Sequence, residues 1–283
     1  MLSYRHAFHA GNFADVLKHL VLTGTLRYAI GKETPLLYLD THAGGGIYRL
    51  DSAEAQRTGE AAQGILQLDL PALAERCSEA GAALLRDYHE VLAPFLARRN
   101  YPGSPLVAAA VLRARDHLHL CELHPADHEH LLSATHRDRR IRVEQADGFQ
   151  RAVTLLPPVQ KRAVVLIDPA YEVKQDYRTV VRTLNGIHQR MKSAQVLLWY
   201  PVVHRSEIDR LVSSLQHSRL RDVWQVELGV KPDAPGHGMT ASGLMLVNPP
   251  WTLPGALREV LPLIQEKLAP ETGHWRVERL IDE

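Results

Sequence analysis

Short apolar stretches alternate along this chain with longer stretches in which apolar residues recur every three or four positions. The short stretches are rich in Val, Ile and Leu, as buried strands are, and they lie at 36–40, 117–122, 141–144, 163–167, 194–200, 224–230 and 243–247. Helical spacing covers 11–30, 106–115, 123–135, 176–191, 204–217 and 257–268. This alternation predicts an α/β fold with a mixed, mainly parallel seven-stranded sheet.

A long segment, residues 47–102, separates the first predicted strand from its expected helix. Connections in α/β units are normally about 2–6 residues long. Within the segment, 59–68 and 71–99 have helical spacing, so we predict a helical subdomain inserted into a single domain that spans 1–283. Its 6 Arg against 8 Asp plus Glu do not make a basic arm, which leaves substrate recognition and a packing or dimerisation role both open.

The predicted strand over 163–167 is followed directly by Asp168-Pro169-Ala170-Tyr171. Ligands of open α/β sheets bind just beyond the carboxyl ends of the strands. An aromatic amine is a poor nucleophile, because its lone pair is delocalised into the ring. The Asp168 carboxylate and the Pro169 carbonyl could each accept one N–H of such an amine, and Tyr171 could stack on the base for about 1–3 kcal/mol. A plain polar turn is the alternative.

This tetrapeptide resembles the Asp-Pro-Pro-Tyr signature of methyltransferases that use S-adenosylmethionine (SAM) to methylate exocyclic amines or a side-chain amide. Ala170 stands where the signature has its second proline, which would fix φ. A second stretch, Asn-Pro-Pro-Trp at 248–251, matches the signature better letter by letter. It does not follow the fourth strand, however, so we interpret it as the end of an edge strand, where proline is tolerated.

Polar residues at three other strand ends fit a cofactor site. The strand over 36–40 runs into the glycine-rich turn 41–46, which lets the backbone approach a ligand and resembles the first SAM-binding motif of Rossmann-like methyltransferases. Glu122 ends the second strand, where a carboxylate binds ribose hydroxyls. Asp147-Gly148 follows the third strand, where an acid in SAM enzymes commonly meets the adenine amine. The glycines alone are equally consistent with a plain turn.

The composition restricts the possible functions but does not point to one of them. The chain of 283 residues is 45% hydrophobic and 23% charged, with a net charge of +1, so any nucleic-acid binding must be local. The most basic run, 136–142, is either a solvated helix end or a phosphate-contacting edge. Two cysteines without a pairing pattern, no signal peptide and no membrane-length apolar run favour a cytoplasmic protein.

Motifs spread over nearly the whole chain resemble one family, the bacterial 23S ribosomal RNA adenine-N6 methyltransferases of the J type. The resemblance is carried by the motifs at 1–6, 9–12, 15–19, 39–44, 101–105, 122–125, 146–150, 199–203 and 237–243. It implies a Rossmann-like methyltransferase core with a helical insertion, SAM as cofactor without a metal, and protein-free 23S ribosomal RNA as substrate. A monomer is expected.

The resemblance also implies roles for individual residues. Asp168 would be the catalytic acceptor, with Pro169 and Tyr171. Contacts to SAM are implied for His19, His42, Ser104, Glu122, Asp147, Gly148 and Asp168. Contacts to the RNA are implied for Tyr4, His6 and Lys18. Two alternative enzymes are a DNA adenine-N6 methyltransferase and a protein glutamine methyltransferase. A third alternative is a protein that binds SAM and RNA but is inactive, because Ala170 has impaired the loop.

Overall fold

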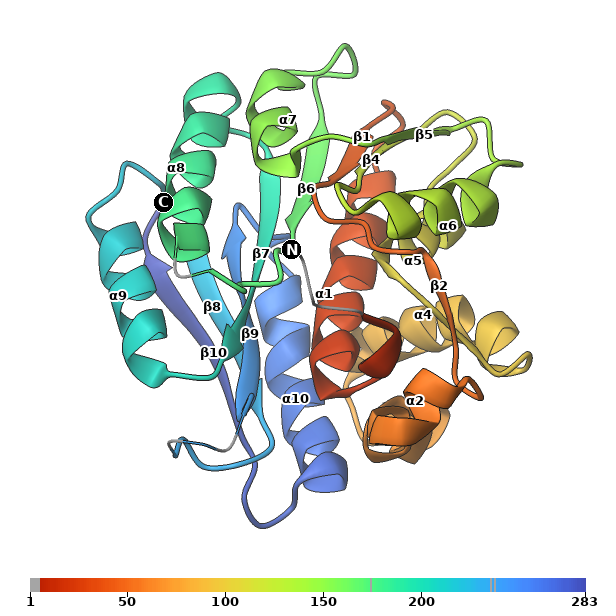
Figure 1. Ribbon diagram of the computed structural model, residues 1–283. Coiled ribbons are helices and arrows are strands. Elements are labelled where there is room, and N and C mark those ends of the chain that lie inside the picture. The colour runs from red at the N-terminus through yellow and green to blue at the C-terminus, as the bar shows by residue number, and fades with distance from the viewer. Residues whose placement is uncertain (1–5, 174, 235, 237) are drawn as a thin grey trace.

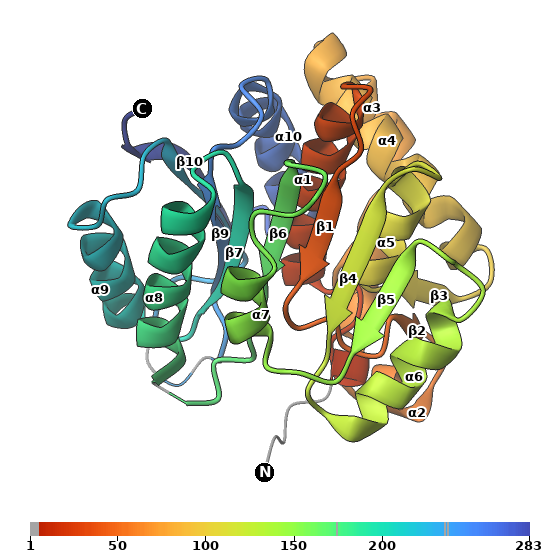
Figure 2. The same ribbon diagram turned by 90° about the horizontal axis from the view of Figure 1, so that it is seen from above.

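A computed structural model describes residues 6–173, 175–234, 236 and 238–283. Its centre is an eight-stranded sheet in the order β10-β8-β9-β7-β6-β1-β4-β5 (Figures 1 and 2). The strands are β1 Leu37–Asp40, β4 His117–Cys121, β5 Ile141–Glu144, β6 Ala163–Ile167, β7 Gln195–Val202, β8 Val223–Gly229, β9 Ala241–Val247 and β10 His274–Ile281. β1, β4, β5, β6 and β7 run parallel, whereas β9 is antiparallel to β7 and β8. The predicted fold class and mixed, mainly parallel sheet are confirmed.

The predicted number of strands is wrong, because the sheet has an eighth strand. β10 pairs with β8 alone and forms one edge of the sheet. Val277 is its one buried side chain, and Arg276, Glu278 and Arg279 surround it. A charged edge strand of this kind discourages pairing with other chains, but it lacks the apolar run by which the other strands were recognised.

Two layers of helices cover the sheet. α1 Phe13–Ile30, α5 Ser104–Val111 and α10 Leu253–Leu268 lie on one face, and α7 Gly148–Thr154, α8 Gln175–Arg190 and α9 Arg205–Gln216 lie on the other (Figure 2). α6 Pro125–Thr135 packs against β5. The short α7 was not predicted, and α5 ends four residues before the predicted 115. None of the helices in the described residues combines the length and the apolar character that a membrane span requires.

The inserted segment is closed at its base by a two-stranded ribbon. β2 Ile47–Arg49 pairs antiparallel with β3 Asn100–Pro102, so the segment leaves and rejoins the core at one place. Between them lie α2 Ala53–Thr58, two 3-10 turns at Glu60–Gln63 and Ile65–Gln67, α3 Leu70–Ala74 and α4 Glu79–Leu96. The helix predicted over 59–68 is therefore wrong, and the one over 71–99 is two helices, since the chain leaves helical geometry between Ala74 and Glu79.

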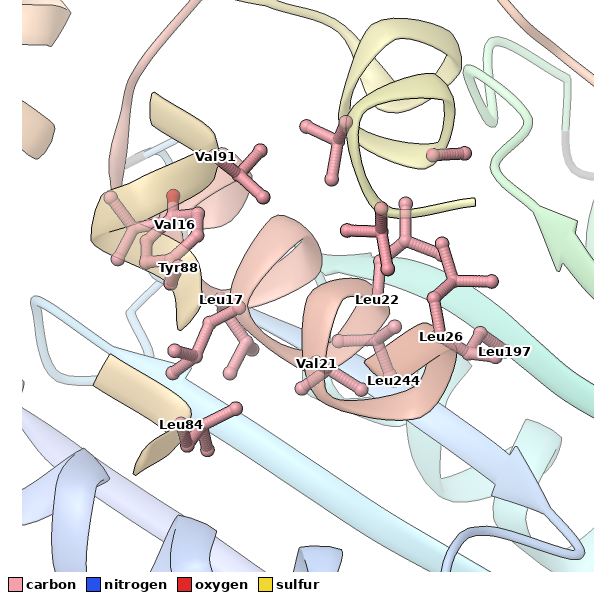
Figure 3. Packing of buried hydrophobic residues seen from close by; sticks show 14 of the residues in the cluster. Val16, Leu17, Val21, Leu22, Leu26, Leu84, Tyr88, Val91, Leu197 and Leu244 are labelled. Carbon is pink, nitrogen blue, oxygen red and sulfur yellow. The ribbon is translucent and has the colours of Figure 1, made fainter. Parts of the chain in front are cut away.

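The inserted segment shares the main hydrophobic core of the protein. α1 is packed between α4 on one side and β7 and β9 on the other (Figure 3). Leu84, Tyr88 and Val91 of α4 belong to the same buried cluster as Leu197 of β7 and Leu244 of β9. Because α1 is apolar around most of its circumference, it can bury one side on the sheet and the other on the inserted segment.

Candidate active site

A cavity of about 370 Å³ lies where the carboxyl ends of β1, β4 and β6 meet the start of α1. Most of the predicted site residues line it: His6, Lys18, His19, His42, Ser104, Glu122, Asp147, Gly148, Asp168 and Pro169. They come from segments up to 163 positions apart, the separation of His6 and Pro169. The residues that follow strands meet because parallel strands present their carboxyl ends at one edge, and the others come from around the starts of α1 and α5. Tyr171 is not among the lining residues, and Tyr4 lies outside the described residues.

Close backbone packing forms the floor of the cavity. Gly44 has a φ of +61°, which favours glycine, and a Cβ added there would lie 2.4 Å from the Tyr48 hydroxyl. A Cβ on Gly148 would lie 1.9 Å from the Thr41 carbonyl oxygen. The loop at Gly148 can therefore lie against the Thr41 backbone only because this residue has no side chain, and Gly44 leaves room for Tyr48 in the same way.

Two carboxylates at the strand ends face the cavity. Glu122 accepts N–H groups from Gly44 at 2.8 Å and His124 at 2.7 Å, and burial raises its pKa. Asp147 caps α7 through Oδ1, which accepts the Phe149 N–H at 2.9 Å. Both acids are thus held rigidly at positions from which a carboxylate can bind ligand hydroxyl or amine groups.

A third carboxylate, which the sequence analysis did not single out, lies beneath the cavity. Asp40 is fully buried at the end of β1 and accepts hydrogen bonds from Tyr38 at 2.8 Å and Ser104 at 2.7 Å. Burial raises the pKa of Asp40 to about 6, despite these two donors. Since Ser104 starts α5, the contact joins the strand to the helix. The sequence could have indicated Asp40, because it is an acidic residue at the end of the first predicted strand.

Asp168 meets an ion-pair chain that begins on α1. Lys18 Nζ lies 2.7 Å from Asp168 Oδ2 and 3.0 Å from Asp15 Oδ1, and His6 Nε2 lies 2.9 Å from Asp15 Oδ2. Burial alone would raise the pKa of Asp15, but His6 and Lys18 outweigh it and hold this pKa well below its usual range. Lys18, which the family resemblance assigns to the substrate, is therefore also a direct partner of the predicted catalytic acid.

Trp199 lines the cavity, together with Tyr48 and Phe149, whereas Tyr171 does not. The Tyr171 hydroxyl donates to the Trp199 carbonyl at 2.8 Å, and its ring packs on Tyr177 with centroids 4.5 Å apart. Trp199 lines the cavity, and its Nε1 donates to the buried Ser242 hydroxyl at 2.7 Å. The Trp199-Tyr-Pro motif at the end of the fifth predicted strand could have indicated this position.

The second signature-like stretch lies at the opposite edge of the sheet. β9 ends where β7 begins, with Val247 paired to Val196, so Asn248 follows β9 at the amino ends of the parallel strands. The Asn248 amide donates to the carbonyls of Lys192 and Ala194, both at 2.8 Å, and Trp251 is 81% exposed. The stretch follows a strand, as predicted, but the prediction of an edge strand is wrong, because β9 lies between β7 and β8.

Two histidines of the cavity wall are neutral. Burial lowers the pKa of His19 to about 3 and that of His42 to about 4. His19 lines the cavity, and its Nε2 is buried and has no hydrogen-bond partner among the described residues. A buried nitrogen of this kind indicates a ligand group at that point, because buried polar atoms are nearly always hydrogen-bonded. The described residues include no group of three or more His, Cys, Asp or Glu side chains arranged for a metal ion.

A mainly parallel sheet with a glycine-rich loop after β1, acids after β4 and β5 and an Asp-Pro turn after β6 defines a Rossmann-like SAM-dependent methyltransferase. Residues 33–281 match the family model described as ribosomal RNA large subunit methyltransferase D, RlmJ. The chain belongs to this family.

Relatives of similar length support the family membership. The chain is 46% identical over 291 residues to ribosomal RNA large subunit methyltransferase J of Escherichia coli, and 43% identical over 288 residues to the Haemophilus influenzae protein of the same name. Each comparison covers 100% of both chains. A crystal structure of a Legionella pneumophila protein matches with a TM-score of 0.86 at 33% identity, over 96% of this chain and 98% of that one.

Proposed function

We propose that this protein transfers the methyl group of SAM to the exocyclic N6 amine of one adenine in 23S ribosomal RNA, with protein-free RNA as its preferred substrate. The observation that carries the proposal is the shared cavity, in which the Asp168-Pro169 turn faces the glycine loop and the two strand-end acids. A methyl donor and an amine acceptor can be held side by side in such a cavity, and positioning of this kind supplies much of the rate. The names of the relatives support the RNA substrate.

The geometry of Asp168 supports its assignment as the acceptor for the amine. Lys18 occupies Oδ2 at 2.7 Å, which orients the carboxylate and leaves Oδ1 to accept one N–H of the amine. The Pro169 carbonyl would accept the other N–H. With both N–H groups held, the lone pair of N6 points out of the ring plane toward the methyl donor, and Asp168 can take the proton that N6 loses.

The residues for the cofactor fit the chemical groups of SAM, which supplies an electrophilic methyl group on a sulfonium. Glu122 would accept the ribose hydroxyls and Asp147 the adenine amine, each from a position fixed by backbone N–H donors. His19, His42, Ser104 and Gly148 complete the wall.

For the target base, the structure supports a role for Trp199 in addition to Tyr171. The Trp199 ring lines the cavity, and Lys18 Nζ lies 5.8 Å from its centroid. A base flipped out of the RNA and placed on this ring would have its amine close to Asp168. Tyr171 would support Trp199 from behind and stack on the base only after a change in its loop. Tyr4 and His6, from the N-terminal segment, remain proposed RNA contacts.

Methyl transfer from labelled SAM tests the proposal on four substrates: protein-free 23S ribosomal RNA, intact large subunits, duplex DNA and a protein extract. We expect N6-methyladenine in the free RNA and no product with the others. Product in DNA or at a protein glutamine would support the alternative enzymes, and SAM binding without transfer to any substrate would support an inactive protein.

Two variants with opposite expectations locate the site. Asp168→Asn keeps the shape of the side chain but replaces one acceptor oxygen by a donor, and we expect it to abolish transfer while the fold remains. The matched control is Trp251→Ala, which alters the second signature-like stretch at the far edge of the sheet and should leave the activity unchanged. Full activity of Asp168→Asn would refute the mechanism.

A further inference from the structure

Three buried polar side chains form a row that runs from the inserted segment to the cavity. Tyr88 lies on α4, Tyr101 on β3 and His19 on α1, and none of them is exposed. The hydroxyl oxygens of Tyr88 and Tyr101 are 3.1 Å apart, and the Tyr101 hydroxyl lies 2.9 Å from His19 Nδ1. The Tyr101 ring also stacks on the His19 ring, with centroids 5.5 Å apart. The row ends at His19, which lines the cavity and whose buried Nε2 has no hydrogen-bond partner among the described residues.

The number of protons in the row determines which group donates each hydrogen bond. A neutral imidazole carries one N–H, and each hydroxyl carries one O–H. If His19 Nδ1 donated to Tyr101, Tyr101 would donate to Tyr88, and the Tyr88 proton would have no acceptor among the described residues. In the opposite direction Tyr88 donates to Tyr101 and Tyr101 donates to His19 Nδ1, so that both buried hydroxyl protons are used. Burial favours this second arrangement, because an unmade buried hydrogen bond is costly.

The second arrangement places the single imidazole proton of His19 on Nε2. We propose that Tyr101 of the inserted segment, whose hydroxyl accepts from Tyr88, donates to Nδ1 and so holds His19 in this tautomer, and that Nε2–H is a donor for the carboxylate of the methionine part of the cofactor. The inference rests on the proposed SAM site and names a positioning role for the inserted segment within it.

Among the polar groups of the cavity wall, Lys18 is already paired with Asp15 and Asp168, and His19 offers a donor that suits a carboxylate. Glu122 and Asp147 are acceptors and suit hydroxyl and amine groups. The Ser104 hydroxyl already donates to Asp40 at 2.7 Å. His19 Nε2–H is a donor fixed in place by the row behind it, and an N–H that meets a carboxylate makes a charge-assisted hydrogen bond.

Nitrogen NMR on protein with labelled histidine tests the direction of the row without any ligand. We expect a protonated Nε2 and a bare Nδ1 for His19 in the wild-type protein. A proton on Nδ1 would overturn the inference. Because this measurement needs no variant, it decides the direction even if the variants below fold poorly.

Two matched variants each remove one buried hydroxyl from the row. Tyr101→Phe removes the donor to Nδ1, and we expect the KM for SAM to rise about tenfold while the KM for RNA is unchanged. Tyr88→Phe leaves Tyr101 donating to His19, so the KM for SAM should change about twofold or less. His19→Gln, whose amide can present an N–H near the position of Nε2, should bind SAM better than His19→Leu.

The outcomes separate this inference from the proposed function. A Tyr101→Phe variant that changes the KM for RNA instead of SAM, or a Tyr88→Phe variant that weakens SAM as much as Tyr101→Phe, would overturn the row as a cofactor-positioning device. Failure of the wild-type protein to bind SAM would refute the proposed function itself, whatever the tautomer of His19.

Discussion

Lys18 joins the predicted catalytic acid to the buried core, and its removal should affect both activity and stability. Its Nζ lies 2.7 Å from Asp168 Oδ2 and 3.0 Å from Asp15 Oδ1, and its side chain is 6% exposed. Lys18→Met replaces it by an apolar side chain of similar length. The variant therefore keeps the volume but leaves two carboxylates without their shared cation.

The magnitude follows from opposing terms. At an effective dielectric constant of about 20, a contact of 2.7–3.0 Å between unit charges is worth about 5–6 kcal/mol. Desolvation of the buried charges takes back several kcal/mol, and the removal of one partner from a buried pair typically costs about 3–5 kcal/mol. We expect Lys18→Met to lower the free energy of unfolding by about this amount at pH 7.

The effect should depend on pH with a definite sign. The folded pKa of Asp15 is held well below its ordinary value, so its stabilising contribution is present above about pH 4 and is lost as the pH falls through the folded pKa. Without Lys18 the pKa of Asp15 rises, so ionised Asp15 stabilises the variant less, and the variant loses less stability as the pH falls. The difference in unfolding free energy between wild type and variant should therefore be largest near neutral pH and shrink below about pH 4.

Urea unfolding of the wild type, Lys18→Met, Asp15→Asn and the double variant measures this coupling. Asp15→Asn removes the buried charge that Lys18→Met strands, so the double variant should be less destabilised than the sum of the two single variants, by about 1–3 kcal/mol. Additive effects, or a loss in Lys18→Met that does not shrink between neutral pH and a pH well below about 4, would refute the reasoning. Methyl transfer by Lys18→Met should fall at least tenfold in kcat, because Asp168 loses the contact that orients its carboxylate.

Three further changes test other parts of the site. Gly148→Ala places a Cβ 1.9 Å from the Thr41 carbonyl, so calorimetry should show SAM binding weakened more than about tenfold, whereas unchanged affinity would mean that the loops are not packed as described. Trp199→Leu removes the aromatic face and should raise the KM for RNA about tenfold, with Ser242→Ala a smaller change in the same direction; equal KM values for all three proteins would exclude Trp199 as the base platform. Ala170→Pro should leave the rate constant of methyl transfer in single-turnover assays unchanged or raise it. A large loss would show that the loop needs a φ that proline cannot adopt.

The sequence was informative where one short stretch carries both an element and its chemistry. Each parallel strand of the core is an apolar run, and the polar residues after β1, β4, β5 and β6 follow directly. Since parallel strands end at one edge, local patterns were enough to bring Glu122, Asp147 and Asp168 into one site. The family resemblance added His19, His42 and Ser104, which no local pattern distinguishes from core or surface residues.

Strand number and aromatic placement depended on tertiary packing. β10 has no apolar run because an edge strand buries only one side chain firmly, here Val277. The Tyr171 ring packs on Tyr177, and Trp199 lines the cavity where the signature led us to expect Tyr171. The direction in which a side chain points after a strand end is set by its neighbours in space. The sequence of a motif does not specify it.

By itself, then, the sequence determined the α/β fold, the carboxyl edge of the sheet as the place of the site, and the acids that face it. The tertiary structure alone joined Lys18 to Asp168 across 150 positions and brought Tyr88 and Tyr101 of the inserted segment behind His19. The physical reason is one of range. Periodicity and strand ends are local properties of the chain, whereas a buried hydrogen bond between distant segments exists only after helices and sheet have packed around it.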